Sequence, residues 1–480
     1  MQRLYSSLLL AGLVLLFQIS INVSFAQQNQ TSNKKNIEAQ FIKIDEFIKQ
    51  QIQVDDINAV VLNIYQGGKQ VHQFAFNQNA DSQFVIGSLS KSFTALAIMQ
   101  LVEAGLIDVQ QTMDVYLPSS LLSNNTKKKY PTVHQLLSQT SGFSTAQGLD
   151  AWPRVFISLD TRVGELVEQL QEKQIQASFE YSNSNYTLLS KIVEFVSGQN
   201  FTDYIDQHIF KPLNMQNSFA DINHPSIKLA PAYNYFLGFA YQSEYKQSNW
   251  RAGEAKMVST ANDYGKYLQW QLNPKSHPEV LSAKGLVDLR DSTKYSNYYN
   301  AGWFRNNSGS MFSHSGSVEN SLSYTVFFPK RDLAIIVFIN GIDFVFGVEK
   351  SNLGRNIRDM YFGYYYENKT DNGVAPKVLY VSLLLIVIQL FMLRLLIKTQ
   401  QWVIRSGLVL LNVTLWLSII KILYSEFNIS LTYARIIMPD LGWFLTVNCL
   451  LVLVTVLLFI FLTVKSLMAA KRNDGEMGVK

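Results

Sequence analysis

The sequence has a single cysteine and few histidines, and this scarcity removes several kinds of site. The one cysteine, Cys449, lies inside a long apolar run, so the part of the chain before it has no disulfide, no thiol nucleophile and no cysteine metal ligand. The six histidines show neither i,i+4 pairing nor an H-x-x-E-H pattern. We therefore expect no metal site and no cofactor.

A basic surface suited to nucleic acid is also missing. The formal net charge is +5, from 41 Lys and Arg against 36 Asp and Glu. Much of this excess flanks the apolar runs near the C-terminus, and no basic run carries interleaved aromatic residues. Nucleic acid is therefore not an expected partner.

Composition divides the 480 residues into segments with different expected roles. Residues 1–26 combine Arg3, an apolar run and the small-x-small ending Ser24-Phe25-Ala26, which is the pattern of a secretory signal peptide. A polar leader without apolar periodicity follows over residues 27–36. The remaining expected segments are a folded domain (37–365), a linker (366–377), a transmembrane region (378–464) and a cytoplasmic tail (465–480).

Three apolar runs near the C-terminus have the length that a transmembrane helix requires, about 20 residues. They cover Val378–Ile397, Ser406–Tyr424 and Leu441–Val464. Lys398 and Arg405 lie between the first two runs without any acidic residue, and more basic residues follow the third run. The positive-inside rule therefore puts these parts in the cytoplasm and the folded domain outside, which is also the topology that a signal peptide gives. Three spans without a cluster of charges argue against a transporter.

Apolar patterning indicates that both ends of the outer domain contribute strands to one sheet. Ala59–Tyr65 and Val71–Phe76 read as a β-hairpin around a Gly-Gly turn. Helix and loop signals dominate the middle of the domain. Strand signals return only at Ser323–Phe328 and Leu333–Ile339, and a helix is expected from Val348 to Phe362. This order predicts one α/β domain with a helical insertion.

The stretch Phe84–Gly105, FVIGSLSKSFTALAIMQLVEAG, places a serine and a lysine three residues apart at the start of an apolar helix. Ser88 occupies the position of an N-cap, where Glu or Gln three residues later is usual, but the sequence has Lys91 there. The same S-x-x-K pattern occurs three more times in other surroundings, so chance is one interpretation. The other is a nucleophilic serine activated by a lysine whose pKa is lowered by its apolar neighbours.

Two further polar motifs follow the serine and the lysine. Tyr181–Asn183 precedes an apolar helix, and His314–Gly316 lies between strand-like segments, where glycine allows a substrate to approach the backbone. Each motif alone is equally consistent with an ordinary turn. Their order, at intervals of about 90 and 130 residues, makes the combination specific.

Together, Gly87–Lys91, Tyr181–Asn183 and His314–Gly316 resemble the three signatures of the serine β-lactamase and penicillin-binding-protein superfamily. The branch is the one that contains class C β-lactamases, D-aminopeptidases, DD-carboxypeptidases and family VIII esterases. The resemblance implies an α/β fold of the β-lactamase/transpeptidase type. In that fold helices flank an antiparallel sheet and an all-α subdomain is added, and here three transmembrane helices would follow.

The resemblance also implies a role for each matched residue. Ser88 would be the nucleophile that forms an acyl-enzyme, and Lys91 and Tyr181 would share the proton transfers. Tyr181 is the preferred base, because a neighbouring cation favours its phenolate. The backbone N–H groups of Ser88 and Ser317 would form the oxyanion hole. The other expected substrate-binding residues are Asn183, His314, Ser315, Gly316 and Asn320.

The sequence departs from the family pattern at two places. One is Val318–Ser321, where the branch often has a Gly-Phe pair instead of Asn320 and Ser321. The other narrows the expected activity. His314 stands where true β-lactamases have lysine, and a histidine is the weaker carboxylate anchor at neutral pH, which argues against efficient β-lactam hydrolysis. An ectodomain followed by three helices resembles the colibactin-type prodrug-activating peptidases, which remove an N-acylated D-asparagine cap. Asn320 corresponds to an asparagine of that subgroup and would form hydrogen bonds with a substrate amide. Val85, three residues before Ser88, stands where that subgroup has an acidic residue.

The sequence thus predicts a serine hydrolase of the bacterial inner membrane, with its catalytic domain on the periplasmic side, that cleaves a small peptide, amide or ester substrate. A D-amino-acid-specific peptidase, a β-lactamase and a carboxylesterase are alternatives within the superfamily. A non-catalytic ligand-binding sensor is the alternative outside it, and binding alone does not need Ser88, Lys91 and Tyr181 together. The sequence leaves open the identity of the substrate and whether copies of the chain form a homo-oligomer.

Overall fold

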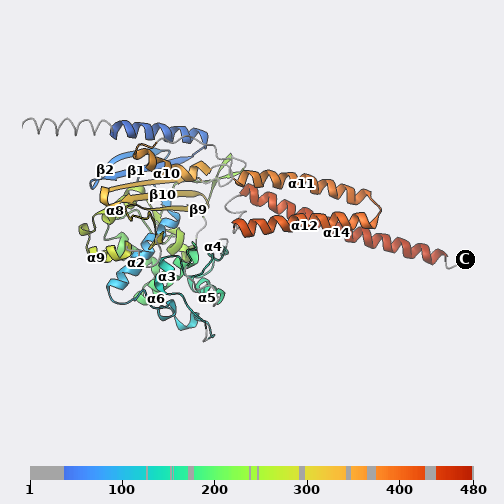
Figure 1. Ribbon diagram of the computed structural model, residues 1–480, viewed down its shortest axis with the longest axis horizontal. Helices are drawn as coiled ribbons and strands as arrows, with labels where there is room; N and C mark the ends of the chain where they lie inside the picture. Colours follow the sequence, from blue (N-terminus) through green and yellow to red (C-terminus); the bar gives the residue numbers. More distant parts are fainter. Residues whose placement is uncertain are drawn as a thin grey trace, which may run out of the picture.

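A seven-stranded antiparallel sheet in the order β2-β1-β11-β10-β9-β8-β7 forms the centre of the domain (Figure 1). The computed structural model describes residues 37–477 except 126–127, 152–153, 155, 171–177, 237–238, 246–247, 291–297, 342–347, 365–373 and 428–438. The expected signal peptide and leader lie outside the described residues, as does most of the expected linker.

The predicted hairpin and the predicted meeting of the two ends of the domain are both confirmed. β1 (Ala59–Gln66) pairs with β2 (Lys69–Phe76) on one side and with β11 (Leu333–Asn340) on the other. Gly67 and Gly68, with φ of 61° and 69°, form the two-residue turn, which requires positive φ at both positions. The C-terminal strand therefore lies beside the N-terminal strand in one sheet.

The other half of the sheet contains the strand that lines the site. β10 (Ser321–Phe328) pairs with β11 and with β9 (Phe312–Val318). β8 (Trp303–Arg305) and β7 (Tyr299–Asn300) complete the edge. β8 reaches β9 only at Phe312 and Ser313, so among the described residues no strand pairs with the outer edge of β9 beyond that point.

Helices cover both faces of the sheet, because its central strands are apolar on both sides (Figure 1). The helical residues 37–54 and α10 (Val348–Tyr361, predicted from Val348 to Phe362) pack on one face. The other face carries α2 (Ser90–Glu103) and α8 (Ala261–Leu272). Thr260 caps α8 by accepting a hydrogen bond from the Asp263 N–H, a common helix start.

A helical region lies below this layer and corresponds to the expected all-α subdomain (Figure 1). Its helices are α3 (Val133–Leu137), α4 (Thr145–Leu149), α5 (Leu159–Gln169), α6 (Asn183–Ser197) and α7 (Phe201–Ile205). The other helical elements are η1 (Gly87–Leu89), η2 (Met113–Tyr116), η3 (Ser119–Leu121), η4 (Asp206–Phe210), η5 (Asn249–Arg251), η6 (Ala252–Lys256), η7 (Pro274–Ser276), α9 (Ala283–Arg290) and η8 (Pro329–Arg331). Two small sheets pair β3 (Phe84–Val85) with β6 (Val258–Ser259), and β4 (Ala232–Phe236) with β5 (Phe239–Ser243).

Three long helices extend from the domain side by side (Figure 1). They are α11 (Val374–Lys398), α12 (Trp402–Phe427) and α14 (Pro439–Met477), and each contains a stretch long and apolar enough to cross a membrane. α12 begins four residues before the predicted run, and α14 continues as helix through most of the predicted tail, which contains Lys465.

Amide side chains join the three helices to one another. The Asn448 amide of α14 donates to the Ser382 hydroxyl of α11 at 2.9 Å, and Asn412 of α12 donates to the Thr455 hydroxyl at 3.1 Å. In an apolar environment such bonds fix the register of neighbouring helices. The helices therefore form one bundle.

Candidate active site

Lys91 is fully buried at the start of α2 and touches three oxygen atoms. Its Nζ lies 3.0 Å from the Ser88 Oγ, 2.8 Å from the Asn183 Oδ1 and 2.7 Å from the Glu254 carbonyl oxygen. Ser88 belongs to η1, and α2 begins only at Ser90 without a side-chain cap. The expectation that Ser88 is a helix cap is therefore wrong, and its hydroxyl is free to face Lys91.

The surroundings favour a neutral amine at Lys91. Burial lowers the pKa of Lys91 to about 7, against the opposing influence of the Glu254 carboxylate and with help from Arg251. Of the three partners of Nζ, the amide oxygen and the carbonyl oxygen can only accept hydrogen bonds. The Ser88 hydroxyl can also donate. The neutral amine therefore has its lone pair directed at the Ser88 O–H.

Tyr181 lies over Lys91, with the Lys91 Nζ 5.1 Å from the centre of its ring. Burial raises the pKa of the Tyr181 phenol far above its ordinary value, and the hydrogen bond with Ser88 offsets only part of the rise. This direction is opposite to the expected phenolate. The reason is that burial disfavours charge on both groups: it keeps the proton on Tyr181 and lowers the pKa of Lys91 to about 7, so that about half of Lys91 is neutral at pH 7.

Two glycines bring the backbone of η1 against β9. A Cβ on Gly87 would lie 2.5 Å from the Ser317 backbone nitrogen, and one on Gly316 would lie 3.0 Å from the Ser88 nitrogen and still closer to the Ile86 carbonyl oxygen. Only residues without a side chain permit this approach. The backbone nitrogens of Ser88 and Ser317 consequently belong to two closely packed segments, and both residues line the cavity described below.

Serines on β10, which the sequence analysis did not single out, hold this segment in place. The Ser321 hydroxyl donates to the Val85 carbonyl oxygen at 2.8 Å, and the Ser323 hydroxyl donates to the Ile86 carbonyl oxygen at 2.7 Å. Both bonds are buried, so they are not weakened by competition with water. No periodic pattern distinguishes these serines from other small polar residues of a strand.

A cavity of about 330 Å³ opens above Ser88. Its polar and aromatic wall contains most of the predicted site residues. The described residues that line it are Ser88, Tyr181, Phe304, His314, Ser315, Gly316, Ser317, Leu322, Ser323, Tyr324, Ile339, Gly354 and Arg355. Phe304 stacks on Tyr181 with ring centres 6.1 Å apart, and Arg355, from α10, is the one permanent charge among these described residues. Neither was found by sequence reasoning, because neither belongs to a motif.

His314 is buried and uncharged. One ring nitrogen lies 2.7 Å from the Ser315 carbonyl oxygen and therefore carries the proton, while the other lies 3.3 Å from the Tyr299 hydroxyl. Burial and the charge of Lys91 lower the pKa of His314 to about 3. His314 therefore contributes no positive charge to the cavity at neutral pH.

The structure brings the remaining predicted residues together only in part. Ser315, Gly316 and Ser317 line the cavity, and Asn183 approaches it by holding Lys91. Asn320 is not among the lining residues. It is buried in the β9–β10 turn, where its amide donates to the Ser243 hydroxyl of β5 at 3.1 Å.

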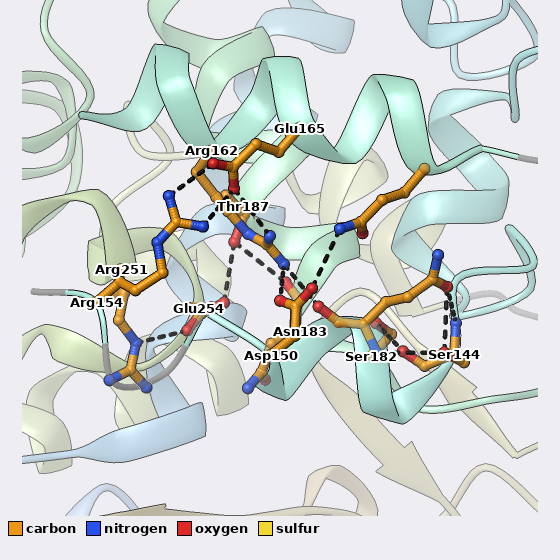
Figure 2. A network of polar contacts seen from close by, with 12 residues as sticks. Ser144, Asp150, Arg154, Arg162, Glu165, Ser182, Asn183, Thr187, Arg251 and Glu254 are labelled. Atoms are coloured by element: carbon orange, nitrogen blue, oxygen red, sulfur yellow. Dashed lines mark hydrogen bonds and ion pairs between the residues drawn. The ribbon is translucent and has the colours of Figure 1, made fainter. Parts of the chain in front are cut away.

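Four buried charged residues lie near Lys91, which contacts one of them through the Glu254 carbonyl oxygen. The four are Arg251, Glu254, Lys256 and Glu319. Glu254 accepts hydrogen bonds from the Arg251 guanidinium at 2.8 Å and from the Thr187 hydroxyl at 2.9 Å (Figure 2). Lys256 lies 2.6 Å from Glu319, and Arg251 lies 3.6 Å from the same carboxylate. The two positive and two negative charges balance one another. The carbonyl of Glu254, which holds Lys91, is in the π-helical turn η6, and such turns are frequent at functional sites.

Comparison with known proteins gives matches over most of the folded domain. A family model described as Beta-lactamase matches residues 44–351. The protein flp of Staphylococcus aureus strain MW2 is 28% identical over 315 residues, which are 62% of each chain. Penicillin-binding protein 4* of Bacillus subtilis is 28% identical over 264 residues, which are 49% of this chain and 56% of that one. This chain thus spans less than two thirds of the length of these curated relatives.

Solved structures with the same fold have lower sequence identity. The octameric penicillin-binding protein homologue from Pyrococcus abyssi is 22% identical, with a TM-score of 0.57 over 70% of this chain and 81% of that one. The D-stereospecific amidohydrolase from Streptomyces sp. is 19% identical, with a TM-score of 0.53 over 63% of this chain and 94% of that one. Both show that the antiparallel sheet and its helices form a shared fold.

Proposed function

Because the chain belongs to the Beta-lactamase family, we propose that it is a membrane-anchored serine hydrolase that cleaves an amide or peptide bond through an acyl-enzyme on Ser88. The observation that carries this proposal is the contact between Ser88 and a buried Lys91 whose pKa is about 7. A neutral amine facing a hydroxyl is the arrangement that activates a serine.

In the proposed acylation, the proton of the Ser88 hydroxyl moves to Lys91 as the Oγ attacks the substrate carbonyl carbon. The backbone N–H groups of Ser88 and Ser317 stabilise the negative oxygen that forms. When the bond to the leaving nitrogen breaks, that nitrogen takes the proton of the Tyr181 hydroxyl, and Lys91 returns its proton to Tyr181. Water then attacks the acyl ester by the reverse route, and Ser88 regains its proton.

An amide is the preferred substrate class because its leaving group needs a proton. Tyr181 remains protonated at neutral pH and lies against Ser88, so it can supply that proton. A preference for a D-residue is an extension of this proposal, which the fold likeness to a D-stereospecific amidohydrolase supports only at the level of architecture. The burial of Asn320 gives no support to its role as a reader of the substrate amide.

The charges that line the cavity indicate which residue binds an anionic group of the substrate. His314 is neutral, so a carboxylate beside it would find no cation there. Arg355, from α10, lines the same cavity. We infer that an anionic group of the substrate binds Arg355, where a guanidinium offers paired hydrogen bonds.

Membrane attachment is the second part of the proposal. The apolar stretches of α11, α12 and α14 support it, and the basic residues between the first two spans favour an outer, periplasmic position of the hydrolase domain. A protease added outside sealed inner-membrane vesicles should therefore remove the hydrolase domain only when the vesicles are right-side-out.

The activity is tested with the full-length protein in detergent against matched panels of acyl-D- and acyl-L-amino acid amides, short-chain esters and β-lactams. Ser88→Ala should abolish the hydrolysis of every active substrate. Ser92→Ala is the matched control, since its buried hydroxyl lies one helical turn further on and donates to the Leu89 carbonyl oxygen. Hydrolysis that survives in Ser88→Ala, or the absence of any turnover together with tight ligand binding, would contradict the proposal and favour a sensor.

A further inference from the structure

The β4–β5 hairpin has two faces with different surroundings. Its register pairs Phe236 with Phe239 and Asn234 with Tyr241, so these four residues share one face. Tyr235 lies on the opposite face, which packs on the domain: its hydroxyl donates to the Asp56 carbonyl oxygen at 2.5 Å and accepts from the Asn58 amide at 3.0 Å. The hairpin is thus fixed to the domain by one side.

The other face exposes aromatic side chains. The exposed fractions of Phe236, Phe239 and Tyr241 are 38%, 77% and 42%. Residues 232–243 include no Asp, Glu, Lys or Arg. An uncharged hairpin with an exposed aromatic face is unusual for a surface in water, and such faces usually mark an interaction site.

The position of the hairpin identifies what covers this face. β4 contacts α14, and burial together with the nearby carboxylate of Asp440, in the first turn of α14, raises the pKa of the Tyr241 phenol. Trp443 and Tyr380, near the N-terminal ends of α14 and α11, are exposed aromatic residues of the kind that marks the boundary of a membrane. From Asp440 to Trp443 the helix rises only about 4.5 Å.

The boundary layer of a bilayer on each side of its hydrocarbon core is about 5–8 Å thick. A hairpin beside Asp440 therefore lies at the depth of the lipid headgroups. Aromatic side chains are favoured at this depth, and the absence of charge removes the main penalty for entering it. We propose that Phe236, Phe239 and Tyr241 insert into the headgroup region of the outer leaflet, so that the hairpin is a lipid contact separate from the three spans.

This contact has a consequence for the site. Ser243 ends β5 and accepts a hydrogen bond from Asn320 in the turn that ends β9, the strand that lines the cavity. The hairpin would therefore hold the end of β9 beside the lipid headgroups. A substrate that lies in the membrane surface would then reach the cavity without leaving the membrane. The inference rests on the proposed membrane anchoring.

The test uses full-length protein in phosphatidylcholine–phosphatidylglycerol vesicles, with an environment-sensitive fluorophore on a single cysteine. In the Cys449→Ser background, Phe239→Cys and Phe236→Cys are the test positions. Phe195→Cys is the matched control, since Phe195 is also an exposed aromatic residue, 48% exposed, but on α6. A separate sample keeps the native Cys449, which is exposed on the third span, and carries the fluorophore there to test the membrane anchoring.

The expected result is strong quenching at positions 236 and 239 by lipids that carry a nitroxide near the headgroup, with iodide quenching several-fold weaker than at position 195. The probe on Cys449 should be quenched by nitroxides deeper in the acyl chain. If positions 236 and 239 were as open to iodide as position 195, or were protected from iodide without lipid quenching, as beneath a second protein, the hairpin inference would be overturned. Failure of lipid quenching at Cys449 as well would overturn the anchoring, while hydrolysis by the labelled protein would leave the chemistry of Ser88 intact.

Discussion

Asn183→Asp is the substitution that most sharply tests whether Lys91 acts as a neutral base. It replaces the amide oxygen 2.8 Å from the Lys91 Nζ by a carboxylate of nearly the same shape. A carboxylate this close favours the ammonium form and raises the pKa of a lysine by about 1 to 3. Since the starting pKa is about 7, the limb of the pH–rate profile should move toward pH 9.

The size of the loss follows from the neutral fraction. At pH 7 about half of the wild-type Lys91 is neutral, whereas a pKa raised by about 2 leaves about 1% neutral, so kcat/KM should fall about 50-fold. Activity should rise with pH, because Lys91 loses its proton as the pH rises. Asn183→Asp should therefore regain activity at pH 9 to 10. The assay is kcat/KM between pH 5 and pH 10 on a neutral amide substrate.

Asn183→Leu supplies the control, because it removes the same oxygen without adding charge. Its rate should fall at every pH, but its limb should stay at or below that of the wild type, because nothing has been added that favours the ammonium. A limb at about pH 7 that does not move in Asn183→Asp would refute the assignment of that limb to Lys91. A wild-type profile without a limb near pH 7 would contradict the same assignment.

Three further predictions follow from the site. Tyr181→Phe should keep its fold and lose at least about 100-fold of amide turnover, more than of turnover of an ester with a good leaving group, because the lost group is a proton donor; equal losses on both substrates would speak against that role. Gly316→Ala should lower the rate on any active substrate about 100-fold to 1000-fold, because the added methyl group pushes η1 away from β9 and separates the backbone N–H groups of Ser88 and Ser317. Arg355→Met should raise KM for an anionic substrate about tenfold or more and leave a neutral analogue unchanged, and equal effects on the two substrates would count against an anion site.

The sequence pattern predicted the elements of the fold correctly wherever the local signals agree with the tertiary structure. The β1–β2 hairpin follows from apolar strands around Gly67 and Gly68, which suit a turn with positive φ. The sequence singled out Ser88 and Lys91 as a pair because they lie three residues apart at the start of an apolar segment, and the structure places the two side chains in contact. The cap assigned to Ser88 failed because the tight turn at Gly87 draws η1 toward β9, so the helix begins later than the N-cap pattern indicates.

The residues that sequence reasoning missed depend on long-range contacts. Phe304 and Arg355 reach the cavity from β8 and α10, and nothing in their neighbouring sequence marks them. The Glu254 contribution is a backbone carbonyl, which no side-chain pattern can encode. The pKa values of Lys91 and Tyr181 likewise depend on burial, so the sequence could name the pair but not decide which of the two loses its proton.

In the proposed mechanism Ser88 carries the acyl group during turnover, and rapid-quench intact-mass analysis of the full-length protein with a slowly hydrolysed acyl-D-amino acid amide should detect this intermediate. We expect one transient adduct that has the mass of the acyl group without its leaving amine. Digestion should place it on the peptide that contains Ser88, and Ser88→Ala should show none. An adduct that persists in Ser88→Ala, or turnover of the wild type in which no adduct appears at any time or pH, would rule out an acyl-enzyme on Ser88.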